Sequence, residues 1–138
     1  MVNGMIIDPD KRFYYEHDKF LNYRISGHGQ QTIIFLHGFG ASGLTWTDLL
    51  PLLDDNRYRY VIFDLIGSGY SSKPRNADYS MLANAKAILK FITETQLNDY
   101  FIVGHSFGGG VALLNAMKAM EGASSPPVNL RDGVSLIV

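Results

Sequence analysis

The stretch that most constrains the fold is the pentapeptide Gly104-His105-Ser106-Phe107-Gly108. An apolar, β-prone run at 100–103 precedes it, and a helix-like run at 111–114 follows it. Strand, sharp turn with serine at the apex, and helix make up the context of a G-x-S-x-G nucleophile elbow. Such a turn brings backbone segments very close, so Gly104 and Gly108 suit the flanking positions because they lack side chains. Ser106 would then project over a helix N-terminus, where the helix dipole favours developing negative charge.

A pentapeptide of this pattern could also arise by chance, because the chain contains 14 glycines. Its position between a predicted strand and a predicted helix argues against chance. Two further glycine-containing loops upstream, at 37–42 and 64–71, strengthen the functional interpretation.

Composition limits the classes of function that remain. The 138 residues suffice for one globular domain, and a net charge of −1 indicates neither nucleic acid nor an anionic membrane surface as partner. The chain has no cysteine, which fits a reducing compartment, so we predict a cytoplasmic location. We expect no signal peptide and no membrane span, because no apolar run is long enough. No metal-ligand spacing or phosphate-binding pattern is present, so no metal and no cofactor are expected.

The order of predicted elements indicates an α/β fold. Alternating aromatic-rich segments at 13–16 and 20–25 predict a hairpin, and continuous apolar runs predict buried strands. Those runs lie at 32–36, 60–63, 100–103 and 134–138, and helical periodicity appears at about 79–95 and from the elbow to about 120. We therefore predict a mostly parallel sheet with an N-terminal antiparallel hairpin and helices on both faces. The loops after Leu36, Phe63 and Val103 should converge, since ligands bind beyond the carboxyl ends of such strands.

One more helix is predicted after the loop at 37–42. Thr45 and Asp48 have the spacing of a capping box, and an apolar face would comprise Trp46, Leu49, Leu50 and Leu53.

Three motifs together resemble the N-terminal portion of the α/β-hydrolase fold family, of the broad esterase and lipase kind. They are His37-Gly38 with its loop, Asp64-x-x-Gly67-x-Gly69-x-Ser71, and Gly104-x-Ser106-x-Gly108, in the family's order and approximate spacing. The resemblance runs from about Phe13 to Val138. We predict a single partial domain over 1–138, with 1–12 as an N-terminal extension.

The resemblance implies a role for each motif residue. Ser106 would be the nucleophile, and the backbone N–H groups of Phe39 and Phe107 would form the oxyanion hole. His37, Gly38, Asp64, Gly104, His105 and Gly108 would shape the motifs. A serine at the apex, where family dehalogenases and epoxide hydrolases carry aspartate, favours acyl chemistry on a small-molecule ester or related substrate through an acyl-enzyme.

The family's catalytic acid and histidine follow strands beyond the last one in this chain. None of the four histidines is a clear substitute. We expect His105 to pack beneath the elbow, His37 to hold its loop, and His17 and His28 to be solvated in turns. Asp64 is expected to shape a loop, and Asp132 precedes the last strand and so lies at its wrong end. The chain alone should therefore have at most trace esterase activity.

Three interpretations remain open. The chain is the N-terminal part of a serine hydrolase, or a non-catalytic shortened paralogue that binds a small molecule or dimerises, or the product of a broken reading frame. Because the last strand is apolar and would lie at a sheet edge, self-association through it is also expected.

Overall fold

The computed structural model describes residues 10–121 and 134–137. Within these residues one six-stranded sheet has the order β1-β2-β4-β3-β5-β6. The strands are β1 (Lys11–Glu16), β2 (Lys19–Gly27), β3 (Gln31–Leu36), β4 (Tyr58–Phe63), β5 (Tyr100–His105) and β6 (Val134–Ile137). The first three neighbours, β1, β2 and β4, pair antiparallel, and the remaining pairs are parallel. The predicted α/β class and the N-terminal hairpin are confirmed, and β1 already contains Lys11 and Arg12 of the predicted extension.

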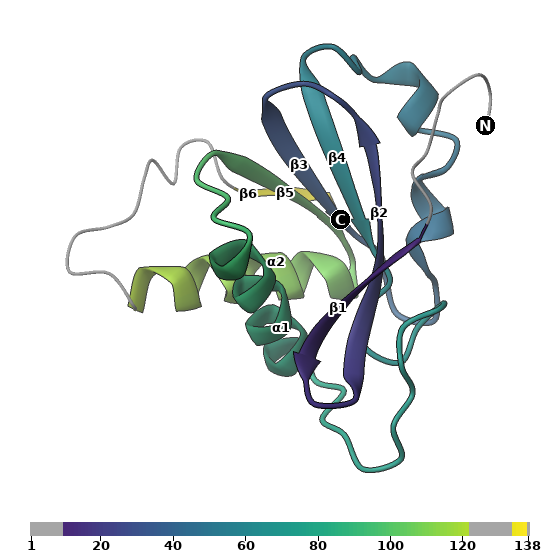
Figure 1. The fold of residues 1–138 in the computed structure, drawn as a ribbon, viewed down its shortest axis with the longest axis vertical. Coiled ribbons are helices and arrows are strands. Elements are labelled where there is room, and N and C mark those ends of the chain that lie inside the picture. The colour runs from purple at the N-terminus through teal and green to yellow at the C-terminus, as the bar shows by residue number, and fades with distance from the viewer. Residues whose placement is uncertain (1–9, 122–133, 138) are drawn as a thin grey trace.

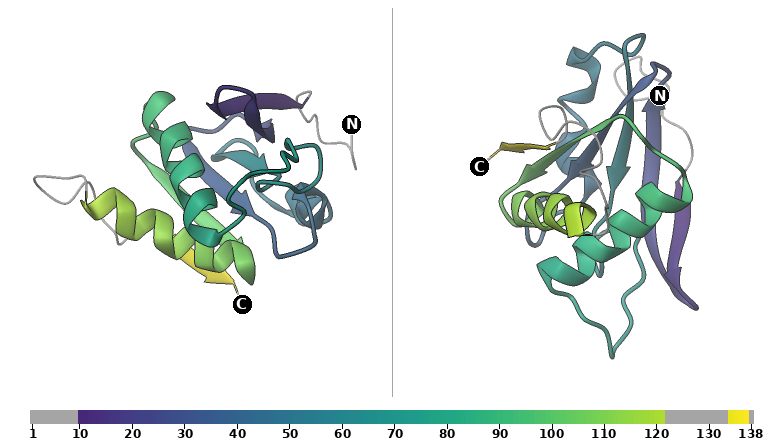
Figure 2. Two further views of the ribbon diagram at one scale, coloured as in Figure 1. Left: turned by 90° about the horizontal axis from the view of Figure 1, so that it is seen from below. Right: turned by 90° about the vertical axis from the view of Figure 1, so that its left-hand side faces the viewer.

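Two α-helices, α1 (Met81–Glu94) and α2 (Phe107–Glu121), cover one face of the sheet. The opposite face is covered by two short 3-10 helices, η1 (Gly43–Trp46) and η2 (Leu50–Leu52), so helical segments lie on both faces (Figure 2). The alternation of β3 explains this division. Ile34 and Leu36 pack into the core under α1 and α2, whereas Phe35 packs with Trp46 on the other side.

The predicted helix with a Thr45–Asp48 capping box does not form. Ser42 caps η1 instead, by accepting a hydrogen bond from the N–H of Leu44 at 3.3 Å. Pro51 has no N–H to continue a helix, and it lies in the first turn of the separate η2. The predicted apolar face is nevertheless correct: Trp46 and Leu50 are buried, and Leu49 and Leu53 pack against their cluster.

Strand register brings the functional loops together. Leu36, the last residue of β3, pairs with Phe63, the last residue of β4, and with Gly104 near the end of β5. The three loops that follow these strands therefore leave the sheet at the same edge.

The sheet has two edge strands, β1 and β6, at opposite sides (Figures 1 and 2). An apolar parallel strand at an edge offers its outer N–H and C=O groups to another chain.

We expect residues 1–138, expressed alone, to self-associate as concentration rises, in native mass spectrometry. The substitution Ser135→Lys should reduce the association, because a charged side chain on an edge strand discourages pairing with another chain. A clean monomer at all concentrations would contradict the expectation.

Candidate active site

Ser106 occupies the turn between β5 and α2. It is one of two described non-glycine residues with positive φ, at 53°, a conformation that costs about 1–3 kcal/mol and is kept only where its surroundings enforce it. Its carbonyl accepts hydrogen bonds from the N–H groups of Gly109 at 2.9 Å and Gly110 at 3.2 Å. Its side chain is exposed. The turn therefore presents a hydroxyl on the loop edge of the sheet.

The two motif glycines make this turn sterically feasible. A Cβ at Gly104 would lie 2.2 Å from the carbonyl oxygen of Gly108. A Cβ at Gly108 would lie 2.3 Å from the carbonyl oxygen of Leu36. Both contacts are with backbone, which has little room to move, so the close approach of β3, β5 and α2 requires glycine at both positions.

Phe39 and Phe107, the predicted oxyanion-hole residues, lie on either side of the elbow. Phe107 is the first residue of α2, where amide groups have no partner within the helix. Phe39 is in the loop after β3. Among residues 10–121 and 134–137, none accepts a hydrogen bond from its N–H. Their ring centroids are 6.3 Å apart and the ring planes are tilted by 56°, and Phe39 is 89% exposed. A Cβ on Gly38 would come within 3.6 Å of the Ser106 Cβ, so the Phe39 loop passes beside the serine.

His37 fixes one end of that loop. Its ring is 1% exposed, Nε2 accepts the N–H of Leu65 at 2.9 Å, and Nδ1 lies 2.8 Å from the carbonyl oxygen of Gly38. These two contacts require a neutral ring with its proton on Nδ1. Burial lowers the pKa of His37, and the Gly38 carbonyl and Asp64 oppose that shift. His37 thus holds the loop and is not free to act as a base.

The neutral state of His37 predicts a pH dependence of stability. The unfolded histidine takes up a proton below about pH 6.5, whereas the folded one resists until its lower pKa is reached. The free energy of unfolding should therefore be highest above about pH 6.5. It should fall as the pH drops from there toward the lower pKa of the folded protein. His37→Gln should be less stable at pH 7.5 and should show a flatter decline to pH 5.5, in urea titrations. An unchanged slope in His37→Gln would contradict this account.

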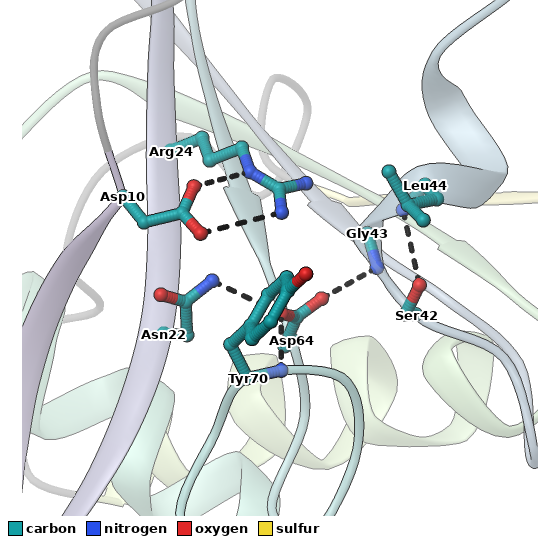
Figure 3. Close-up of polar contacts among 8 residues, drawn as sticks. All are labelled: Asp10, Asn22, Arg24, Ser42, Gly43, Leu44, Asp64 and Tyr70. Carbon is teal, nitrogen blue, oxygen red and sulfur yellow. Dashed lines mark hydrogen bonds and ion pairs between the residues drawn. The ribbon is translucent and has the colours of Figure 1, made fainter.

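Asp64 fixes the other end of the loop (Figure 3). Its carboxylate is 2% exposed, and Oδ1 accepts the N–H of Gly43 at 2.7 Å. Oδ2 accepts the N–H of Tyr70 and the side-chain amide of Asn22, both at 3.0 Å. Gly69, at φ 51°, has no room for a side chain because a Cβ would lie 2.4 Å from the carboxylate. The Asp64 motif therefore shapes two loops at once.

His105 departs from its prediction. It is exposed, not packed beneath the elbow, and its Nδ1 lies 3.1 Å from where a Gly38 Cβ would be. As the last residue of β5 it has left the packed part of the strand, so its ring lies beside the Phe39 loop. His17 and His28 are exposed as predicted, and His28 contacts Asn56. Asp132 lies outside the described residues.

In the described ranges, no side chain forms a hydrogen bond with the Ser106 hydroxyl. These residues also contain no group of three or more His, Asp or Glu side chains placed to hold a metal ion. Among them, no helix has both the length and the apolar character needed to cross a bilayer.

Two buried asparagines that support the functional loops were not predicted from the sequence. Asn22 in β2 bonds Asp64, and Asn84 in α1 accepts the N–H of Ile66 at 2.8 Å, which anchors the second loop. The available pattern was a polar residue within an apolar face: Asn84 precedes the buried Ile88 by one helical turn. For Asn22 the only available signal was a polar residue within a predicted strand, which does not identify its partner.

Comparison with known proteins identifies the class. A family model described as alpha/beta hydrolase fold matches residues 31–127, which include all three motifs. The chain belongs to the α/β-hydrolase fold family, and its predicted membership is confirmed.

Particular relatives share only part of their length with this chain. It is 38% identical over 120 residues to the dihydrolipoyllysine-residue acetyltransferase component of the acetoin cleaving system of Cupriavidus necator, covering 83% of this chain and 31% of that protein. It is 31% identical over 122 residues to the hydrolase YugF of Bacillus subtilis, covering 83% and 42%. A crystal structure of a bacterial membrane phospholipase A matches with a TM-score of 0.71 at 27% identity, covering 96% and 39%. The chain thus spans less than half the length of these proteins.

Proposed function

We propose that this chain is the N-terminal part of a single serine-hydrolase domain, which cleaves ester or related acyl substrates through an acyl-enzyme. The observation that carries the proposal is Ser106 itself: a hydroxyl-bearing residue held at φ 53° between β5 and α2. A strained, exposed serine at a strand-to-helix turn is the arrangement of a nucleophile elbow.

The proposed reaction begins when Ser106 Oγ attacks the acyl carbon and its proton passes to a base. The carbonyl oxygen becomes an oxyanion, which would accept hydrogen bonds from the N–H groups of Phe39 and Phe107. One such donor contributes roughly 10²–10³ in rate, because it meets charge that appears only in the transition state. The tetrahedral intermediate expels the alcohol, and water then hydrolyses the ester formed with Ser106.

The base and its orienting acid are proposed to follow strands beyond the last one in this chain, as the resemblance to the family implies. His37 has both ring nitrogens engaged, and Asp64 is occupied by three donors. Without a base a serine hydroxyl is a weak nucleophile. We therefore expect residues 1–138 alone to accelerate hydrolysis by no more than roughly 10³–10⁴ over water.

Pre-steady-state kinetics test the acyl-enzyme. The protein expressed at full length from its natural gene should release a burst of p-nitrophenol from p-nitrophenyl butyrate, equal to the enzyme concentration. Intact mass spectrometry of the quenched reaction should show a butyryl adduct. Turnover without a burst or an adduct would contradict an acyl-enzyme whose hydrolysis limits the rate, and an inactive protein would contradict the proposal as a whole.

A further inference from the structure

We propose that Asn22 is a positioning residue for the oxyanion hole and acts through the carboxylate of Asp64. The inference rests on the proposed function, because it assigns Asn22 a task in the proposed oxyanion hole. Asn22 lies outside the three loop motifs. Asn22 lies in β2, the antiparallel hairpin strand next to β4.

Asn22 connects β2 to Asp64, directly after β4, by two hydrogen bonds and to the loop that follows by a third. Its carbonyl accepts the N–H of Asp64 at 2.9 Å, and its side-chain Nδ2 donates to Asp64 Oδ2 at 3.0 Å. Its own N–H donates to Ser71 Oγ at 2.8 Å. Asn22 is 3% exposed, so water does not readily replace these partners. Both the backbone and the carboxylate of Asp64 therefore depend on Asn22.

The loop that carries Phe39 is held at both ends by neighbouring residues of a single segment. His37, at its start, accepts the N–H of Leu65, and Gly43, at its end, donates to Asp64 Oδ1 at 2.7 Å. The position of the Phe39 N–H thus depends on how the Asp64–Leu65 segment is placed. Figure 3 shows the Asp64 carboxylate between the Asn22 amide on one side and the Gly43 N–H on the other.

Loss of the Asn22 amide should disturb catalysis more than binding. A buried carboxylate needs its full set of donors, and without Nδ2 its Oδ2 keeps only the N–H of Tyr70. The carboxylate can then rotate toward new donors and loosen its bond to Gly43. A displacement of about 1 Å at a catalytic group can cost about 10²-fold in rate. Because the oxyanion exists only in the transition state, kcat should fall while KM changes little.

Few charged groups face Asp64 besides its donors. Arg24 of β2 pairs with Asp10 and lies near the ring of Tyr70. Burial lowers the pKa of Arg24, whereas the carboxylates of Asp10 and Asp64 raise it, and the net shift is upward. His37 is neutral in its loop. A second carboxylate at position 22 would therefore meet Asp64 directly, and the two would share one proton when the pH is low enough.

The experiment compares Asn22→Leu and Asn22→Asp in the full-length protein, with p-nitrophenyl butyrate as substrate. Asn22→Leu should lower kcat about 10-fold to 100-fold at every pH from 5 to 8, with KM within about threefold of wild type. Asn22→Asp should be similarly impaired at pH 8, but its kcat relative to wild type should rise toward pH 5, because the shared proton restores a donor. The matched controls Asn56→Leu and Asn56→Asp, at an exposed asparagine in the turn before β4, should keep wild-type kcat throughout.

Each other outcome overturns the inference. Folded Asn22→Leu with wild-type kcat, or with raised KM and unchanged kcat, would show that Asn22 only supports the fold. If Asn22→Leu does not fold, the Asn22→Asp ratio decides, and a ratio that stays constant with pH refutes the proposal. Wild-type protein that forms an acyl-enzyme while both variants stay fully active refutes this inference alone. An inactive wild-type protein refutes the proposed function and this inference together.

Discussion

Replacement of Ser106 by alanine is expected to lower kcat roughly 10⁶-fold in the full-length protein, with little change in stability. The serine supplies the atom that bonds to the substrate, so nothing replaces it when the hydroxyl is removed. The variant should bind substrate about as well as wild type, because the ground state makes its contacts elsewhere. Hydrolysis of p-nitrophenyl butyrate measures the loss of activity.

The matched control for this prediction is Thr93→Ala. Thr93 is an exposed residue on α1 whose hydroxyl donates to the helix carbonyl of Leu89 at 2.9 Å. It should retain wild-type kcat. A Ser106→Ala variant that keeps more than about a hundredth of the activity would mean that another residue is the nucleophile.

Valine at Gly104 is expected to destabilise the fold by about 4 kcal/mol or more. Its Cβ would lie 2.2 Å from the Gly108 carbonyl oxygen, and relief would require β5 and α2 to move apart. Gly108→Val should have an effect of the same size, because its Cβ would meet the Leu36 carbonyl oxygen at 2.3 Å. Urea unfolding followed by circular dichroism measures both, and for a marginally stable domain the result is an unfolded protein.

Gly110→Ala serves as the control for these two variants. A Cβ there would meet the sulfur of Met81 at 2.5 Å, but that sulfur belongs to a flexible side chain that can change rotamer. The expected cost is small, and the higher helix propensity of alanine offsets part of it. Equal destabilisation at Gly104 and Gly110 would contradict the claim that the elbow is the tightest point of the fold.

Much of the fold could be predicted because it depends on local patterns. Apolar runs such as 32–36 become strands buried on both faces, and the spacing of Ala85, Ile88 and Ile92 produces one buried face on α1. The elbow was predictable for a steric reason, since glycine at 104 and 108 is required by close backbone approach.

The errors arise where a tertiary contact or a single residue overrides the pattern. Pro51 divides the predicted helix after β3 into two 3-10 segments, although the apolar residues still reach the core. His105 is predicted to pack beneath the elbow, but it is the last residue of β5 and lies exposed. Asn22 could not be recognised, because its partner Asp64 is 42 residues away and only the pairing of β2 with β4 brings them together.

The most direct test of the account is fluorophosphonate labelling of the full-length protein, followed by peptide mass spectrometry. We predict one label per molecule, on Ser106, and a much slower reaction when residues 1–138 are expressed alone. A label on a different residue, or a full-length protein that is folded and stays unlabelled, would contradict the claim that Ser106 is an activated nucleophile.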